Sequence, residues 1–365
     1  MTNLNLLYVI TDLALGGVPL HLHRLVKAMR ERGHEVRVIS LAPDGPVGRT
    51  LRDDGVEVLT CDGGGGWDFR VIGRLARIIR ATQPNIVHAM LFHANLAAKW
   101  AARRVGFPAN RVLCEIQTVE VERRWHLWVD RWTYPLCRLT IGNSPSVVEH
   151  LATQARIPRH RLHLLRGGID PSPYRDARPV DGSTLALPEN VRVALWVGRL
   201  DPVKGLTILV DAFPSVVREV DAHLLLAGDG PMRTALTRQI HRLGLADRVH
   251  LLGARSDVPG LLKLADVFVF PSRTEGLPNS LLEAMAAGCA IVTTDAPGCR
   301  DLIEHQQTGL RVPYGDTRAL SDAIVTVLQD PTLAARLGQC AADEVERHWH
   351  VDRTHEAYSA LYRAV

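Results

Sequence analysis

The chain has 365 residues, of which 46% are hydrophobic and 22% are charged, a composition typical of a soluble globular enzyme. This length is more than one ordinary hydrophobic core accommodates, and it predicts two domains. The net charge of +4 at pH 7 is too small to suggest nucleic-acid binding unless it is concentrated in one patch, but it suits an anionic ligand or a membrane surface.

The cysteines and the apolar runs predict the compartment. The six cysteines show no paired spacing, so neither a zinc site nor a disulfide framework is indicated. No apolar run approaches the roughly 20 residues of a membrane-spanning helix, and the first ten residues lack the basic leader of a secretory signal. We therefore expect a cytoplasmic protein, with peripheral contact at the inner face of the plasma membrane left open.

Strand patterns alternate with helical patterns along the first half of the chain. The predicted strands are residues 4–10, 35–40, 56–61, 85–90, 111–117, 139–143 and 163–165. Helical patterns lie between most of them, notably at 18–31, 71–81 and 95–105. This alternation predicts a parallel, doubly wound sheet.

The alternation restarts after a segment rich in proline, aspartate and glycine. The predicted strands of the second half are residues 191–197, 223–227, 248–252, 265–270 and 290–294. We therefore expect an N-terminal Rossmann-like domain at 1–178, a linker at 179–190, a second Rossmann-like domain at 191–348 and a final helix within 349–365. Such an α/β chain would place its two doubly wound domains on either side of a cleft.

One stretch, Pro271 to Ile303, joins a buried strand through a tight loop to a helix that opens at Ser280. The first N–H groups of a helix lack partners and the helix dipole is positive there, so this loop is predicted to attract an anion. Glu275 and Glu283 bracket the loop with seven residues between them. Their carboxylates suit sugar hydroxyls on either side of a bound phosphate.

Five linked motifs carry a family resemblance. They are PSRTEGLPNSLLEAMAAG at 271–288, VGRLDPVKGL at 197–206, LAGDGP at 226–231, LLG at 251–253 and DVFVFPS at 266–272. In order and spacing they resemble retaining glycosyltransferases of the GT-B fold, specifically glycosyltransferase family 4, whereas the N-terminal half matches more loosely. The resemblance implies a nucleotide-diphosphate sugar as donor, UDP-linked above all, and a last helix that crosses back to the N-terminal domain.

The diphosphate of such a donor gains negative charge as the glycosidic bond breaks, so catalysis needs positive charge beside it. Many glycosyltransferases use a metal held by Asp-x-Asp, a motif that this sequence lacks. Arg199 and Lys204 are the alternative source, because Arg199 follows a strand at the carboxyl edge of the sheet and Lys204 comes five residues later. Either residue alone could be a solvated surface charge; together they predict catalysis without a metal or other cofactor.

The resemblance also implies roles for the phosphate loop and its neighbours. Glu275 would hold hydroxyls of the donor sugar and Glu283 those of the ribose, although Ser280 and Glu283 also fit a helix capping box worth about 1 kcal/mol. The remaining donor contacts are Gly16 and Gly17 at the phosphates, Gly253 and Arg255 beside the base, and Gly276, Leu277, Pro278, Asn279 and Ser280 around the diphosphate. The first loop is not Gly-x-Gly-x-x-Gly, so a dinucleotide site is poorly supported.

The sequence says less about which residues bind the acceptor. The family often has a histidine after the strand equivalent to 112–116, where this chain has Gln117. His88 and His93 lie at another strand end and are alternatives, so we take His93 and Gln117 as acceptor-side candidates. A single histidine is more often structural.

Trp125, Trp128 and Trp132 recur at helical spacing among Arg123, Arg124 and Arg131. They could form a face that docks on anionic lipid. The favoured interpretation is an aromatic stripe packed on the core of the N-terminal domain.

Together these features predict a retaining, metal-independent glycosyltransferase that moves a sugar from a UDP-sugar to a hydroxyl of a saccharide or lipid-linked saccharide. By resemblance, the setting is bacterial cell-envelope or exopolysaccharide synthesis. The alternative enzyme is a GT-B sugar-nucleotide epimerase. A non-catalytic nucleotide-sugar-binding subunit is the alternative of another class, and it would be expected to lack Arg199, Lys204 or Glu275.

Overall fold

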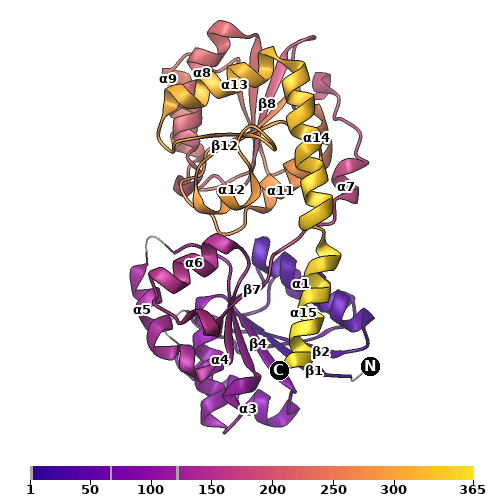
Figure 1. The fold of residues 1–365 in the computed structure, drawn as a ribbon, viewed down its shortest axis with the longest axis vertical. Helices are drawn as coiled ribbons and strands as arrows, with labels where there is room; N and C mark the ends of the chain where they lie inside the picture. The colour runs from indigo at the N-terminus through magenta and orange to yellow at the C-terminus, as the bar shows by residue number, and fades with distance from the viewer. Residues whose placement is uncertain (1–2, 66–67, 121–122) are drawn as a thin grey trace. The chain divides into compact units, whose positions relative to one another are not determined.

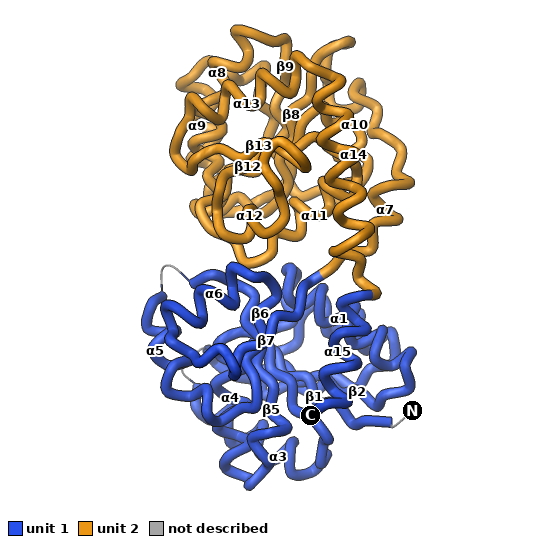
Figure 2. The backbone as a smooth tube through the Cα atoms, viewed as in Figure 1, with its two compact units in different colours: residues 1–167, 353–365 blue, residues 168–352 orange. Residues whose placement is uncertain are grey.

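The computed structural model describes residues 3–65, 68–120 and 123–365, which form two compact units. Unit 1 comprises residues 1–167 and 353–365, and unit 2 comprises residues 168–352 (Figure 2). Each unit has one parallel sheet flanked by helices (Figure 1). The predicted fold class, with two Rossmann-like domains, is confirmed.

The sheet of unit 1 has seven parallel strands in the order β3-β2-β1-β4-β5-β6-β7. They are β1 (Asn5–Ile10), β2 (Glu35–Ser40), β3 (Glu57–Thr60), β4 (Ile86–Met90), β5 (Val112–Ile116), β6 (Leu139–Gly142) and β7 (Leu162–Leu164). The helices are α1 (Gly17–Glu31), α2 (Pro46–Asp53), α3 (Arg70–Thr82), α4 (Phe92–Arg104), α5 (Arg124–Thr133), α6 (Pro145–Thr153) and α15 (Val351–Ala364). The strands agree with the predicted ones to within one or two residues at each end.

The sheet of unit 2 has six strands in the order β10-β9-β8-β11-β12-β13. They are β8 (Arg192–Val197), β9 (Ala222–Ala227), β10 (Val249–Gly253), β11 (Val267–Phe270), β12 (Ile291–Thr294) and β13 (Leu310–Val312). The helices are α7 (Ser172–Arg175), α8 (Leu206–Glu219), α9 (Arg233–Arg242), α10 (Val258–Leu264), α11 (Asn279–Ala286), α12 (Pro297–Leu302), α13 (Thr317–Gln329) and α14 (Pro331–His348). The prediction missed β13, because three residues are too few to show a strand pattern.

Alternation along β1 explains why unit 1 carries helices on both faces of its sheet. Leu6, Tyr8 and Ile10 join one buried cluster with residues of α1, α2 and α15. Leu7 and Val9 join the opposite cluster with residues of α3 and α4. Successive side chains of a strand point to opposite faces, so a strand that is apolar throughout needs a helical layer on each side.

The boundary between the units falls at residues 167 and 168. Residues 168–190, which include the expected linker, lie within unit 2. Backbone hydrogen bonds hold this segment there, from the N–H of Ile169 to the carbonyl of Trp349 and from the N–H of Val180 to the carbonyl of Gly260. Across the described residues, no helix is both long enough and apolar enough to cross a membrane.

The last helix, α15, is attached to unit 1 by a buried hydrogen-bond network. The hydroxyl of Tyr358 donates to Glu115 Oε2 over 2.7 Å. The hydroxyl of Tyr362 lies 2.7 Å from His88 Nδ1 and 3.0 Å from the hydroxyl of Tyr8. Glu115 is completely buried, so its carboxylate depends on buried polar partners such as the Tyr358 hydroxyl.

Burial raises the pKa of the Glu115 carboxyl, but His88, His21 and the Tyr358 hydrogen bond outweigh it. The pKa therefore lies below its ordinary value of 4.5. Because the folded-state pKa is lowered, the ionised Glu115 carboxylate stabilises the folded unit fully above pH 4.5. This stabilisation is lost as the pH falls through the folded-state pKa.

We predict that Tyr358→Phe lowers the free energy of unfolding of unit 1 by about 1.5–3 kcal/mol, because it removes a hydrogen bond to a charged group. The difference from wild type should be full at pH 7 and shrink below pH 4.5, as measured by denaturant unfolding. Tyr134→Phe in the same unit is the control, since the ring contact with Arg161 remains. A difference that stays constant down to pH 3 would show that Tyr358 does not bond an ionised carboxylate.

Candidate active site

The site begins at the switch point of the unit 2 sheet, where strand order reverses between β8 and β11. Open α/β sheets bind ligands at this place, outside the carboxyl ends of the strands. β8 ends at Val197 and leads through Arg199 into the short turn Pro202–Lys204. β11 ends at Phe270 and leads into the loop that contains Glu275. The two loops with the predicted catalytic residues therefore leave neighbouring strands.

A glycine lets these two loops come together. Gly205 has φ +68°, and a Cβ there would lie 2.0 Å from the carbonyl oxygen of Pro271. The N–H of Arg273 donates to the carbonyl of Val203 over 2.9 Å. No side chain could be accommodated at position 205 without moving one of the loops.

This approach brings Lys204 and Glu275 together. Lys204 Nζ donates to Glu275 Oε1 over 2.7 Å, and the ammonium lies 5.6 Å from the centre of the Phe270 ring. The two side chains are 22% and 11% exposed, so water reaches both but surrounds neither. A cation and a carboxylate thus lie side by side at the carboxyl edge, where one could meet a phosphate and the other a hydroxyl.

Arg199 lies on the same edge and is exposed. Its guanidinium forms no hydrogen bond or ion pair within the described part of the chain, whereas Lys204 is already paired. The structure therefore brings Lys204 and Glu275 into contact and leaves Arg199 open to solvent.

Two further motifs hold the loop that carries Arg199. A Cβ at Gly228 would lie 1.7 Å from the carbonyl oxygen of Gly198. The N–H of Gly228 donates to the carbonyl of Gly253 over 2.7 Å, which joins the ends of β9 and β10. The glycines of VGR, LAGDGP and LLG thus lie next to one another. Backbone contact leaves no room for a side chain at Gly228, whereas a Cβ at Gly253 would lie 3.8 Å from its nearest neighbour, a guanidinium nitrogen of Arg233.

The start of α11 differs from the prediction. The helix begins at Asn279 with Pro278 as its N-cap, and no side-chain hydrogen bond caps it. Ser280 therefore lies inside the first turn, and the expected capping box with Glu283 is wrong. Glu283 is half-buried on the same helix.

Pro278 also changes the set of phosphate-loop donors. Because proline has no N–H, only Leu277, Asn279 and Ser280 of this segment can donate from the backbone. Their N–H groups have no acceptor among the described residues. Gly276 lies under α12, where a Cβ at Gly298 would be 2.5 Å from its carbonyl oxygen.

The remaining predicted donor contacts lie in different places. Gly253 ends β10 with φ +72°. Arg255 follows it, but its guanidinium is engaged by Asp257 through hydrogen bonds of 2.8 and 2.5 Å. Gly16 and Gly17 are exposed at the start of α1 in unit 1. Among the described residues, no cluster of three His, Cys, Asp or Glu side chains could hold a metal ion.

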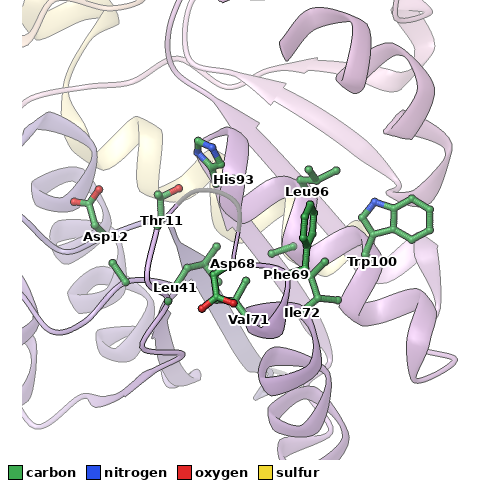
Figure 3. A pocket seen from close by; sticks show the side chains of 14 residues that line it. Thr11, Asp12, Leu41, Asp68, Phe69, Val71, Ile72, His93, Leu96 and Trp100 are labelled. Carbon is green, nitrogen blue, oxygen red and sulfur yellow. The ribbon is translucent and has the colours of Figure 1, made fainter. Parts of the chain in front are cut away.

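Unit 1 has a pocket of about 510 Å³ at the carboxyl ends of its own strands. Figure 3 shows Phe69, Ile72, Leu96 and Trp100 at one end, and Thr11 and Asp12 at the other. The pocket therefore offers apolar surface together with a few hydrogen-bonding groups, as small-molecule sites commonly do. The sequence prediction did not identify its apolar residues, which come from the end of β2 and from the segments of α3 and α4.

The structure separates the histidine candidates. His93 lines the pocket, and burial lowers its pKa, which favours the neutral ring that can accept or donate a hydrogen bond. His88 is buried in the network beneath α15, so it is not an acceptor contact. Gln117 lies near that network, where its amide donates to Glu115 Oε1 over 2.5 Å.

The favoured interpretation of the tryptophan stripe is wrong. Trp125, Trp128 and Trp132 of α5 are 41%, 65% and 65% exposed, and they do not pack into the core. The inner face of α5 is formed by His126, Leu127, Asp130 and Thr133. Helical spacing correctly placed the tryptophans together, but it does not show which face turns inward.

Comparison with protein families now identifies the chain. Glycosyltransferase Family 4 matches residues 15–173, and Glycosyl transferases group 1 matches residues 191–330. The chain belongs to the family 4 glycosyltransferases. The enzyme class expected from the motifs is thereby confirmed in both units.

Three curated relatives are similar to this glycosyltransferase. N-acetyl-alpha-D-glucosaminyl L-malate synthase of Bacillus anthracis is 32% identical over 48% of this chain and 46% of its own length. Alpha-D-kanosaminyltransferase of Streptomyces kanamyceticus is 28% identical over 82% of this chain and 81% of its own length. The GDP-mannose-dependent alpha-(1-6)-phosphatidylinositol monomannoside mannosyltransferase of Mycobacterium tuberculosis is 31% identical over 58% of this chain and 60% of its own length. For the first and third of these relatives, the match spans less than two thirds of their length.

A solved structure agrees with the fold along the whole chain. Anabaena HepE, crystallised with UDP, has a TM-score of 0.87 and is 22% identical, with 99% of this chain and 100% of that chain covered. This similarity supports the GT-B fold of the glycosyltransferase.

We predict that Gly228→Ala lowers the free energy of unfolding of unit 2 by about 3 kcal/mol or more, because the new methyl group would overlap the Gly198 carbonyl. Gly244→Ala is the matched control: it has φ +67° but open space around its Cβ, so only the backbone cost of about 1–2 kcal/mol applies. Denaturant unfolding of both variants measures the difference. An equal loss of unfolding free energy in both variants would mean that the close contact between Gly228 and Gly198 is not required for the stability of unit 2.

Proposed function

We propose that this glycosyltransferase transfers a sugar from a nucleotide-diphosphate donor, UDP-linked, to a hydroxyl of a saccharide or lipid-linked saccharide, without a metal ion. The single observation that carries the proposal is the Lys204–Glu275 pair at the switch point of unit 2. In this proposal the ammonium of Lys204 meets the diphosphate and the carboxylate of Glu275 meets the sugar. The UDP bound in the Anabaena HepE structure supports the choice of nucleotide.

In this proposal Arg199 and Lys204 meet the diphosphate. Arg199 is unpaired within the described chain and presents a fork that can bridge two phosphoryl oxygens. Lys204 acts as a point charge whose distance to the leaving group is fixed by Gly205 and Glu275. The open N–H groups of Leu277, Asn279 and Ser280 add donors that need no side-chain movement.

Glu275 holds donor-sugar hydroxyls, and Glu283 holds those of the ribose. The acceptor oxygen bonds to the anomeric carbon as the bond to the diphosphate breaks, and the hydroxyl proton passes to the departing phosphate oxygen. Attack from the face that the phosphate leaves retains the anomeric configuration. We propose retention because the motifs at 197–206 and 271–288 resemble those of retaining glycosyltransferases.

The pocket of unit 1 supports an acceptor with both polar and apolar parts. His93 and the nearby Thr11 can bond hydroxyls, while Phe69 and Trp100 offer surface to an apolar group. A lipid-linked saccharide has both kinds of surface. We place this reaction in the cytoplasm, in bacterial envelope or exopolysaccharide synthesis, and the six free cysteines suit that reducing compartment.

We expect Lys204→Ala to lower kcat/KM by about 10- to 1,000-fold, because the developing charge on the diphosphate loses its cation. Lys27→Ala, at an exposed position of α1, is the control and should keep wild-type turnover. The double variant Lys204→Ala/Glu275→Gln separates two explanations. If Lys204 only neutralises Glu275, the double variant regains activity; under the proposal it stays impaired. Thermal unfolding checks that each variant is folded.

A panel of UDP-, GDP-, ADP- and dTDP-sugars tests the donor and the metal together. We expect UDP-sugars to raise Tm most and to be hydrolysed slowly without acceptor, at the same rate with and without EDTA. Loss of hydrolysis on chelation, with recovery on adding Mg²⁺, would remove the metal-independent mechanism. A larger Tm shift with another nucleotide would change the donor assignment.

A further inference from the structure

The outer face of α5 in unit 1 consists only of tryptophan and arginine. Every exposed residue of Arg124–Thr133 is one of these two types: Arg124, Trp125, Trp128, Arg131 and Trp132. At about 100° per residue these five positions span about 120° of the helix surface. They form one continuous stripe, which we call the Trp/Arg face.

The acidic group of α5 is turned away from this face. Asp130 is buried, 3.6 Å from the ammonium of buried Lys99 on α4. Lys99 Nζ also donates to Thr133 Oγ1 over 3.1 Å. Two buried contacts thus fix the rotation of α5 against α4, so that the tryptophans are held outward.

The surroundings add positive charge. Glu120, before the helix, accepts a hydrogen bond from the N–H of Arg123 and lies 3.0 Å from His126 Nδ1, so this carboxylate is engaged. On the neighbouring helix α4, Arg103 lies 6.0 Å from the centre of the Trp100 ring, which is 42% exposed. The exposed charges of both Phe92–Arg104 and Arg124–Thr133 are arginines.

Exposed tryptophan beside arginine matches the chemistry of a lipid surface. The indole ring has an apolar body and one N–H, and such rings collect at the boundary between lipid headgroups and acyl chains. Each arginine near an anionic leaflet is attracted to it by about 1 kcal/mol. Contiguous apolar surface of this kind on a soluble protein marks an interaction site, and the cationic border matches an anionic partner.

We propose that the Trp/Arg face docks this protein on an anionic lipid surface, with the indole rings of Trp128 and Trp132 among the headgroups and Arg124 and Arg131 on lipid phosphates. The docking requires neither donor nor acceptor. It is therefore separate from the proposed function, and either can fail without the other.

Sedimentation with vesicles tests the docking. Vesicles of phosphatidylcholine with about one third phosphatidylglycerol should bind the wild-type protein, and binding should fall as salt is raised because the charges are screened. Trp128→Ala/Trp132→Ala and Arg124→Glu/Arg131→Glu should each weaken binding about tenfold or more. Arg238→Glu/Arg242→Glu, at exposed positions of α9, makes the same charge change elsewhere and should bind as wild type.

Brominated acyl chains give a second measurement, because they quench tryptophans that reach the headgroup boundary. Wild-type fluorescence should be quenched, and the Trp128→Ala/Trp132→Ala variant should lose most of that quenching. Donor hydrolysis by this variant should remain at the wild-type rate, which shows that it is folded.

Three outcomes would overturn the proposal. The wild-type protein could stay in the supernatant with anionic vesicles, or the tryptophan variant could bind them as tightly as wild type. Fluorescence that responds to soluble oligosaccharides but not to vesicles would assign the Trp/Arg face to saccharide stacking instead.

Discussion

The ion pair between Lys204 and Glu275 is the interaction on which the site of unit 2 depends. It forms only because the loops after β8 and β11 touch, and they touch because position 205 has no Cβ. Backbone geometry is therefore the first requirement and side-chain chemistry the second. Under the proposed function, a cation that a carboxylate already holds in place needs less ordering when the anionic diphosphate binds.

Most of unit 2 could be predicted from the sequence because its determinants are local. Each central strand is a short apolar run followed at once by a glycine-containing motif, and both features are visible in the chain. The prediction that failed concerns a finer detail, the residue that caps the start of α11. Ser280 has the residue type of an N-cap, yet Pro278 takes that place, because the tight loop ends earlier than the preference for serine suggests.

Unit 1 was predicted less fully, because the side chains that contact one another in its buried network are far apart in the sequence. Glu115 and Tyr358 are 243 residues apart, and His88 and Tyr362 are 274 apart, so nothing near His88 shows that α15 covers it. The tryptophan stripe failed for a related reason. Hydrophobicity places the three rings inward, but the buried pair of Lys99 and Asp130 makes the polar face of α5 the inner one.

The two sheets share one strand order, with one strand more in unit 1, but the two units differ in what mainly lines their carboxyl edges. In unit 2 the edge consists of glycines in backbone contact, with Gly228 against Gly198 and Gly205 against Pro271. In unit 1 the edge also has such a glycine, since a Cβ at Gly63 would lie 2.8 Å from the carbonyl oxygen of Leu41, but its pocket is lined mainly by side chains, which can be replaced without breaking the loops. Under the proposed function this division is physically reasonable. A nucleotide diphosphate presents the same charge whatever sugar it carries, so fixed backbone suits it, whereas acceptors differ in shape and polarity, and exchangeable side chains suit them.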